Sequence, residues 1–302
     1  MTHRPEDGAG VADVDLTGRT ALVTGATSGI GRETALALGR LGARVLVHGR
    51  DDERGRAVVD ALEAAGSPEP AFHAADFTSQ TAVEGLATWT RDRTDELDVL
   101  VNNAGAHFDR GALTADGVER TIAVNHLAPF VLTRRLVDRL ADDGRVVVTS
   151  SRTHRRVGLD LEAFTDVTGY DGLEAYSRSK LANVLFVRGL ARRLDGPTAN
   201  ALHPGFIPGS AIWRDAPVYV KAVVGLLAAL PGWATGDVVV TPATGAETAV
   251  YLSASPAVAG VTGGYFADCR RVEPSAAARD DALADRLWAV SERLTGTTWD
   301  DG

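Results

Sequence analysis

The chain has 302 residues, of which 45% are hydrophobic and 24% charged, which suits one soluble globular domain with a large core. Its formal net charge of −9 excludes a surface built mainly for nucleic acid or anionic lipid. A single cysteine, Cys269, rules out a disulfide within the chain and a thiolate metal cluster. It suits a protein of a reducing compartment, and Cys269 is expected to be a small core residue.

The N-terminal residues 1–15 are polar and acidic and lack the apolar stretch of a signal peptide. They are predicted to form a disordered leader before a single domain at 16–302. The longest apolar run, 222–230, is too short to cross a bilayer, so no membrane association is expected.

The first predicted strand, 20–24, runs directly into a glycine-rich turn and then into a helical apolar pattern. Glycines let the backbone approach an anion closely, and a helix N-terminus presents unpaired N–H groups and the positive end of its dipole. The spacing G-x-x-x-G-x-G differs from the generic dinucleotide fingerprint. A pyrophosphate is nevertheless expected at Gly25, Thr27, Ser28, Gly29, Ile30 and Gly31.

Strand and helix patterns alternate along the rest of the chain. Further strands are predicted at 44–48, 71–75, 98–102, 145–150, 199–202 and 264–266. Helices are predicted at 52–65, 80–94, 118–140 with a break near Pro129, 176–194, 245–253 and 280–294. This alternation predicts an α/β fold, a Rossmann-type doubly wound parallel sheet with helices on both faces and a ligand crevice beyond the carboxyl ends of the strands.

A tyrosine and a lysine lie one helical turn apart on the helix predicted at 176–194. Residues four apart share a helix face, so the ammonium of Lys180 is expected to lower the pKa of the Tyr176 phenol from its ordinary value of about 10. Such a phenol exchanges protons near neutral pH. The pair follows a strand that ends in Ser150 and Ser151.

Four motifs in this order make the chain resemble a short-chain dehydrogenase/reductase. They are the glycine turn, Asn102-Asn103-Ala104-Gly105, Ser150-Ser151 and the Tyr176/Lys180 pair. The segments 124–130 and 175–183 and the tail from 264 to 294 are similar to the retinol dehydrogenase-like branch of that superfamily. The resemblance extends from about residue 18 to residue 295, nearly the whole chain.

The resemblance implies reversible hydride transfer between a nicotinamide cofactor and an alcohol or its carbonyl. Tyr176 would exchange the proton of the substrate oxygen, and Ser151, rather than Ser150, would hydrogen-bond the same oxygen. Lys180 would also hold the nicotinamide ribose. Asn125 would support a water chain from Lys180 to solvent or stabilise a broken helix, and these two roles are compatible.

The same resemblance places the rest of the cofactor along the strand ends. Asp76 would hold the adenine, and the alternative is that it caps the helix that follows. Together with Asp76, Tyr176 and Lys180, the residues expected to contact the cofactor are Phe77, Asn102, Ala104, Gly105, Pro204, Gly205 and Ile207. A threonine that relatives carry after the Pro-Gly pair is replaced here by Gly209, with Ser210 as its candidate substitute.

The choice between NADP and NAD depends on the turn after the second predicted strand. The resemblance aligns Gly49 with the acidic position of NAD-preferring relatives and Arg50 with the arginine that binds a 2′-phosphate. Arg32 would add positive charge. Two residues favour NAD(H) instead. Asp51 could be the acid that binds the ribose 2′-hydroxyl in NAD-binding proteins, and Ser28 occupies a position that is basic in many NADP-dependent relatives. The balance favours NADP(H).

The substrate is predicted from weaker patterns. The segment 206–240 is rich in apolar side chains and predicts a substrate lid, which suits a hydrophobic or ring-containing alcohol, aldehyde or ketone. Alternatively, these side chains complete the core or a subunit contact. Candidates for the pocket entrance, where they would suit an acidic or oxygen-rich substrate, are His107, Phe108, His154, Arg155 and Arg156.

A second function class remains beside the enzyme. A dinucleotide-binding redox sensor or structural partner without turnover could keep the same fold, although retention of both Tyr176 and Lys180 favours the enzyme. The expected partners are a small-molecule substrate and copies of the same chain. A cytoplasmic homodimer or homotetramer would associate through helices that include the one bearing Tyr176.

Overall fold

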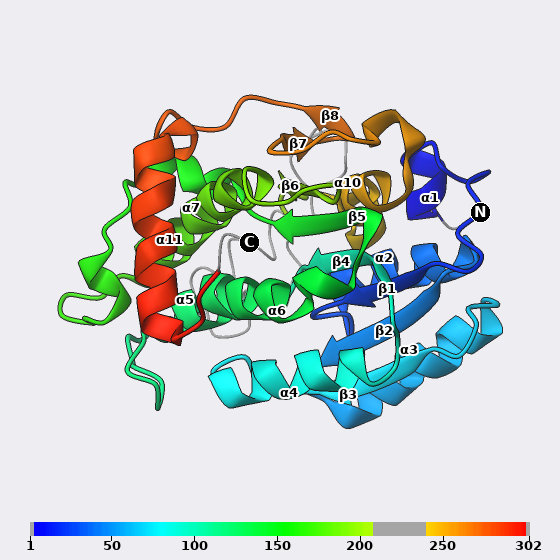
Figure 1. The fold of residues 1–302 in the computed structure, drawn as a ribbon, viewed down its shortest axis with the longest axis horizontal. Helices are drawn as coiled ribbons and strands as arrows, with labels where there is room; N and C mark the ends of the chain where they lie inside the picture. Colours follow the sequence, from blue (N-terminus) through cyan, green and yellow to red (C-terminus); the bar gives the residue numbers. More distant parts are fainter. Residues whose placement is uncertain (1–2, 208–239, 300–302) are drawn as a thin grey trace.

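A parallel sheet forms the centre of the computed structural model, which describes residues 3–207 and 240–299. Within these ranges the sheet has eight strands in the order β3-β2-β1-β4-β5-β6-β7-β8, from bottom to top in Figure 1. The bounds are β1 Thr20–Val23, β2 Arg44–Gly49, β3 Ala71–Ala74, β4 Leu97–Asn102, β5 Leu140–Thr149, β6 Thr198–Leu202, β7 Tyr265–Ala267 and β8 Arg270–Arg271. Neighbouring strands are parallel up to β7, and β8 adds an antiparallel edge.

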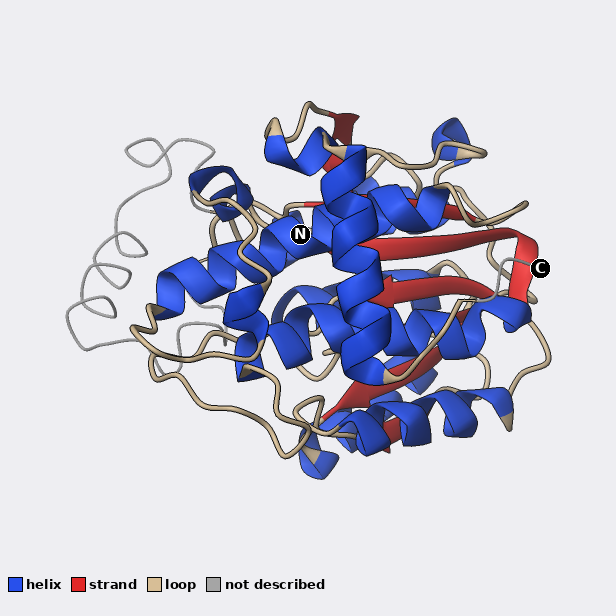
Figure 2. Cartoon of the chain, turned by 60° about the vertical axis from the view of Figure 1, so that its left-hand side comes forward, coloured by secondary structure: helices blue, strands red, loops and turns tan. Residues whose placement is uncertain are grey.

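Helices cover both faces of this sheet (Figure 2). One core packs α4 (Gln80–Arg91), α6 (Ala128–Leu136), α7 (Gly172–Ala191) and α11 (Asp281–Thr295), and the other packs α2 (Gly29–Arg40), α3 (Asp52–Ala64) and α10 (Pro242–Ala254). Because side chains alternate along a strand, Leu22 of β1 joins the first core while Ala21 and Val23 join the second. The predicted doubly wound α/β fold is confirmed.

The helix predicted at 118–140 is divided into four parts, the last of which is the 3₁₀ turn η2, Val137–Arg139. Arg120–Ile122 forms the short helix α5, Ala123–Leu127 forms the π-helical turn η1, and α6 begins at Ala128. Pro129 lies in the first turn of α6, where a missing N–H leaves no hydrogen bond unmade. The break therefore lies in the turn just before the proline.

The disordered leader was a wrong prediction for residues 3–15. Residues Pro5–Gly8 form α1, which packs against α10 and α2. Glu6 accepts two hydrogen bonds from Arg40, at 2.5 Å and 2.7 Å, and Val11 is only 1% exposed. Composition missed this segment because its partners lie on helices that are distant in sequence.

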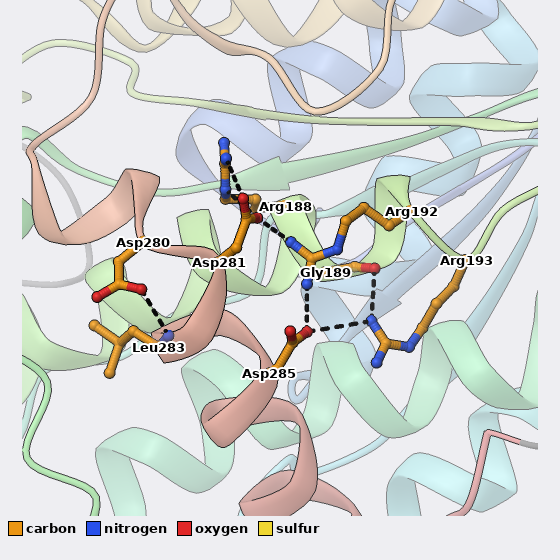
Figure 3. A network of polar contacts seen from close by, with 8 residues as sticks. All are labelled: Arg188, Gly189, Arg192, Arg193, Asp280, Asp281, Leu283 and Asp285. Atoms are coloured by element: carbon orange, nitrogen blue, oxygen red, sulfur yellow. Dashed lines mark hydrogen bonds and ion pairs between the residues drawn. The ribbon is translucent and has the colours of Figure 1, made fainter.

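The C-terminal helix α11 lies across α7 and is held there by ion pairs (Figure 3). Asp281 accepts hydrogen bonds from Arg188 at 2.7 Å and 2.9 Å and from Arg192, which also contacts Asp285. Trp288 of α11 stacks on a phenylalanine of α7 with ring centroids 5.9 Å apart. The face of α7 beneath α11 is therefore covered within the chain.

Most of the expected substrate lid, 206–240, lies outside the described residues. Residues 208–239 are not described, and they include Gly209 and Ser210. Among the helices of residues 3–207 and 240–299, none is long and apolar enough to cross a membrane.

Candidate active site

A cavity of about 630 Å³ lies beyond the carboxyl ends of the central strands. Turns that follow all six strands from β1 to β6 line it. Each predicted cofactor or catalytic residue contributes to the lining except Asn102 and Asn125. Lining residues to which the sequence had assigned no role in the site are His48, Arg54, Ala75, Ala106, Val124, Thr149, Thr153 and Leu173.

The glycine turn between β1 and α2 is built by close backbone approach. Gly25 has a φ of +64°, and a Cβ there would lie 2.8 Å from the Cα of Ala104. A Cβ on Gly31 would lie 2.4 Å from both the Nδ2 of Asn103 and the carbonyl oxygen of Gly25. Ser28 caps α2 without a side-chain hydrogen bond, so the first-turn N–H groups are available for an anion.

The strand end of β4 corrects one predicted cofactor contact. Asn102 is 1% exposed and donates to the hydroxyl of Thr133 at 3.0 Å, behind the cavity. Asn103 lines the cavity instead and donates to the carbonyl oxygen of Thr24 at 2.9 Å. Successive side chains of a strand point to opposite faces, so the motif could place only one of the two asparagines toward the ligand crevice.

His48 is a lining residue that the sequence analysis missed. Its Nδ1 accepts a hydrogen bond from the N–H of Gly25 at 3.3 Å, and its Nε2–H donates to the carbonyl oxygen of Ala75 at 3.0 Å. The ring stacks on Phe77 with centroids 4.1 Å apart. Burial lowers the pKa of His48 to about 4, so the neutral ring joins the glycine turn to the end of β3. Only its place near the end of a predicted strand signalled this role.

Asp76 does not cap α4. Its carboxylate accepts a hydrogen bond from the N–H of Thr78 at 3.0 Å, while Ser79 is the N-cap and accepts from the N–H of Ala82 at 3.4 Å. Asp76 is exposed and lines the cavity beside Phe77. The capping alternative is therefore wrong, and the side chain faces the ligand space.

Of the two charged residues that follow β2, Asp51 interacts with a neighbouring side chain and Arg50 makes no ion pair in the described part of the chain. Asp51 caps α3 by accepting from the N–H of Arg54 at 3.0 Å, and its other carboxylate oxygen lies 3.4 Å from the Nε of Arg54. Arg50 is exposed, lines the cavity and makes no ion pair within the described ranges. Arg32 pairs with Glu33 at 2.9 Å and lies outside the cavity lining, and its contribution to cofactor binding stays a prediction.

Tyr176 and Lys180 lie together on α7. The Nζ of Lys180 is 5.5 Å from the ring centroid of Tyr176 and donates to the carbonyl oxygen of Thr149 at 3.0 Å. Burial lowers the pKa of Lys180 to about 8. Burial also raises the pKa of Tyr176, and a hydrogen bond with the Ser151 side chain lowers it by less. The net shift of the Tyr176 pKa is upward, opposite to the predicted lowering, because desolvation of the phenol dominates.

Only one of the two serines after β5 faces Tyr176. Ser150 is 1% exposed and donates its hydroxyl proton to the carbonyl oxygen of Lys180 at 2.7 Å. The Ser151 hydroxyl is hydrogen-bonded to Tyr176 and accepts from the N–H of Thr153 at 3.3 Å. The catalytic assignment of Ser151 stays a prediction, and this geometry is compatible with it.

Asn125 holds the loop after β4 from within η1. It accepts from the N–H of Ala106 at 2.7 Å, and its Nδ2 donates to the carbonyl oxygen of Ala106 and to the hydroxyl of Ser179, both at 2.9 Å. A Cβ on Gly105 would lie 3.3 Å from the Nζ of Lys180 and 3.5 Å from the Oδ1 of Asn125. The structural role is therefore present, and the proton-relay role stays a prediction.

Two of the five candidates for the pocket entrance lie in the cavity wall. His107 and Arg156 line the cavity, whereas Phe108 and Arg155 do not. The guanidinium of Arg155 instead donates to the carbonyl oxygen of Glu273. Sequence position alone could not separate these neighbours.

His154 was wrongly expected at the entrance, because it is fully buried. Its Nδ1–H donates to the carbonyl oxygen of Ser151 at 2.7 Å, and its Nε2 accepts from the N–H of Ser275 at 3.1 Å. The ring also packs edge-on against Tyr265, whose hydroxyl contacts His203 at 2.9 Å. His154 thus joins the turn after Ser151 to the C-terminal tail.

The sequence is similar to known proteins over most of its length. A family model described as short chain dehydrogenase matches residues 19–216. The bovine (Bos taurus) dehydrogenase/reductase SDR family member 13 is 41% identical over 288 residues, which cover 93% of this chain and 74% of that protein. Human (Homo sapiens) retinol dehydrogenase 14 is 38% identical over 297 residues, which cover 92% of this chain and 87% of that protein.

Solved structures agree with the sequence relatives. A protein from Mycobacterium Paratuberculosis superposes with a TM-score of 0.74 and 31% identity, covering 95% of this chain and 97% of that one. The angucycline C-6 ketoreductase LanV, crystallised with bound NADP, superposes with a TM-score of 0.66 and 29% identity, covering 84% and 95%. The chain therefore belongs to the short-chain dehydrogenase family, with retinol dehydrogenase-like relatives, and is an NAD(P)-dependent oxidoreductase acting on CH–OH and C=O groups.

Proposed function

We propose that this enzyme is an NADP(H)-dependent oxidoreductase that interconverts a hydrophobic or ring-containing alcohol and its aldehyde or ketone. One observation carries the proposal. Ser151, Tyr176 and Lys180 line the same cavity as the glycine turn and Arg50. That cavity, of about 630 Å³, is of the size expected for a small-molecule site.

The residues present fit a nicotinamide dinucleotide. A Cβ on Gly25 or Gly31 would collide with the loop at Asn103 and Ala104 or with the turn itself, so glycine is required for the close turn that brings the N-terminus of α2 to the cavity. When bound, such a cofactor supplies or receives the hydride. Gly25, Thr27, Ser28, Gly29, Ile30 and Gly31 would hold its phosphates, and Asp76, Phe77, Ala104, Gly105, Pro204, Gly205 and Ile207 would border the rest of it.

The charges after β2 support a preference for NADP(H). Asp51 accepts from the N–H of Arg54 and lies 3.4 Å from its guanidinium, and both groups compete with a ribose hydroxyl for the carboxylate. Arg50 adds a positive charge without an acidic partner in the described chain. A 2′-phosphate beside Arg50 would gain charge-assisted hydrogen bonds. LanV, a relative with bound NADP, is consistent with this choice.

The catalytic step follows from the buried groups on α7 and after β5. In reduction, the Tyr176 hydroxyl donates its proton to the substrate oxygen while Ser151 donates a hydrogen bond to that oxygen. The raised pKa of Tyr176 keeps the phenol protonated and ready to donate. This donation leaves a phenolate, which the nearby Lys180 ammonium favours. In oxidation, the phenolate of Tyr176 takes the alcohol proton and becomes the phenol again.

The substrate end of the cavity supports an apolar substrate. Val124, Leu173 and Phe206 line it together with Tyr176. Leu173 is 44% exposed and offers an apolar edge to an entering molecule. The segment 206–240 stays a proposed lid over this end.

A panel of alcohols, aldehydes and ketones assayed with each cofactor tests the proposal. NADPH oxidation with at least one apolar carbonyl is expected, with kcat/KM at least about tenfold above that with NADH. Tight NADPH binding without turnover of any compound would instead favour the redox-sensor function.

We also propose a cytoplasmic location, supported by the acidic composition and the single cysteine. A homodimer or homotetramer remains a proposal. Because α11 covers one face of α7, such an assembly would use other surfaces.

A further inference from the structure

We propose that His107 selects carbonyl substrates that carry a hydroxyl group close to the reacting C=O. The inference rests on the proposed function and concerns the substrate end of the same cavity. Its basis is a histidine whose two ring nitrogens lie in different surroundings.

The ring of His107 is fixed beside the proton donor. Its centroid lies 6.1 Å from that of Tyr176, and His107 lines the same cavity. A Cβ added to Gly172, the first residue of α7, would lie 3.3 Å from the Cε1 of His107. The preceding residue, Ala106, is held through both its N–H and its carbonyl oxygen by Asn125. Because the His107 side chain is only 10% exposed, its ring has little freedom to move away from Tyr176.

The surroundings of the ring assign its tautomer. Nδ1 is buried, has no hydrogen bond in the described structure, and lies 3.4 Å from the Oδ1 of Asp109. A carboxylate at this distance favours a proton on Nδ1. In the neutral ring the lone pair then resides on Nε2, which, unlike Nδ1, is not among the buried unpaired atoms, so it is open to the cavity that His107 lines. Nε2 is therefore an acceptor without a donor among the residues that the structure describes.

An acceptor in this place discriminates between substrates. Tyr176 and Ser151 would engage the carbonyl oxygen, and the apolar Val124 and Leu173 line the same space. A wholly apolar substrate would cover Nε2 and leave it without a partner, which is costly in a buried site. A substrate hydroxyl would donate to Nε2, whereas a methyl ether at the same position could not donate.

Three matched ketones test this. They are hydroxymethyl phenyl ketone, methoxymethyl phenyl ketone and methyl phenyl ketone, each reduced with saturating NADPH. The wild-type enzyme is expected to prefer the hydroxy over the methoxy ketone by roughly ten- to hundredfold in kcat/KM, the effect of one well-placed hydrogen bond in a buried site. The methoxy compound controls for the electronic effect of oxygen next to the carbonyl.

Two variants separate recognition from structure. His107→Phe keeps a ring of similar size and removes both nitrogens, so the ratio of kcat/KM for the hydroxy ketone to that for the methoxy ketone should fall to about one. His107→Gln offers a carbonyl oxygen as acceptor and should restore part of the preference. His73→Phe, on β3 and outside the cavity lining, is the matched control and should leave all three rates unchanged.

The outcomes are distinct. Equal losses for all three ketones in His107→Phe would overturn the inference and leave His107 a structural residue. A wild-type enzyme that reduces all three ketones without preferring the hydroxy compound would also overturn it, with the proposed function intact. Absence of turnover with every carbonyl in the wider panel would overturn the proposed function itself and this inference with it.

Discussion

The two ends of the cavity use charge in opposite ways. At the catalytic end, Tyr176 is half-buried and Lys180 is buried, and desolvation shifts the pKa of each in the direction that favours its neutral form. At the other end, Arg50 and Asp51 are exposed, where solvent and salt screen their charges. We therefore expect desolvation at one end to set proton transfer, and exposed charge at the other end to set the choice of cofactor. Substitutions at the buried end should have the larger effects.

The largest effect is expected for Tyr176→Phe, which removes the proton donor and keeps the ring. We expect kcat to fall about a thousandfold, within the range of general acid catalysis, and NADPH binding to change by less than about threefold. Steady-state kinetics and a fluorescence titration with NADPH measure the two quantities. Tyr251→Phe, on α10 and outside the cavity lining, is the control. Wild-type turnover in Tyr176→Phe would refute the assigned role.

Lys180→Met tests burial through the pH dependence of stability. Because the folded pKa of Lys180 is about 8 against an ordinary 10.5, the unfolded state binds more protons between these values. Burying the charge costs most below about pH 8, and this cost disappears as the pH rises past the unfolded pKa. Relative to Lys180→Met, the wild-type free energy of unfolding should rise by at most about 3 kcal/mol over this window.

Urea unfolding of both proteins near pH 8 and near pH 10 provides this comparison. A difference between them that does not vary with pH would show that Lys180 is not desolvated in the folded protein.

At the exposed end, Arg50→Ala should change cofactor choice and little else. We expect the KM for NADPH to rise about tenfold and the KM for NADH to stay within about twofold, because only the 2′-phosphate would lose a charged partner. The difference should shrink with added salt. The matched control is Arg56→Ala, because Arg56 is exposed like Arg50 but lies on α3, outside the cavity lining. Equal losses for both cofactors would argue against contact with the phosphate.

The smallest effect is expected away from the cavity, at the ion pairs between α7 and α11 (Figure 3). Asp285 is largely exposed, so Asp285→Asn should lower the free energy of unfolding by less than about 1 kcal/mol and leave both KM values unchanged. Urea unfolding of both proteins at low and high salt measures this change in the free energy of unfolding. A larger loss would mean that exposed charge contributes more here than solvent screening allows.

Local patterns were sufficient for much of the fold and part of the site. Six of the seven parallel strands from β1 to β7 lie within one residue of their predicted ranges, because apolar patterns are properties of short segments; β5 starts at Leu140, well before its predicted start at 145. The glycine turn and the four-residue spacing of Tyr176 and Lys180 predicted residues that now line one cavity. The edge strand β8, only Arg270–Arg271, has too few residues to show a pattern and was missed.

What the sequence could not determine depends on partners that are distant in the chain. The ordered N-terminal segment needs Arg40 to pair with Glu6, and the burial of His154 needs the N–H of Ser275. Which of two neighbouring asparagines faces the cavity follows from the pleat at the end of β4. The residue types and spacings thus determined the class of chemistry by themselves, while burial, tautomers and pKa shifts arose only when the folded chain brought remote groups together and excluded water.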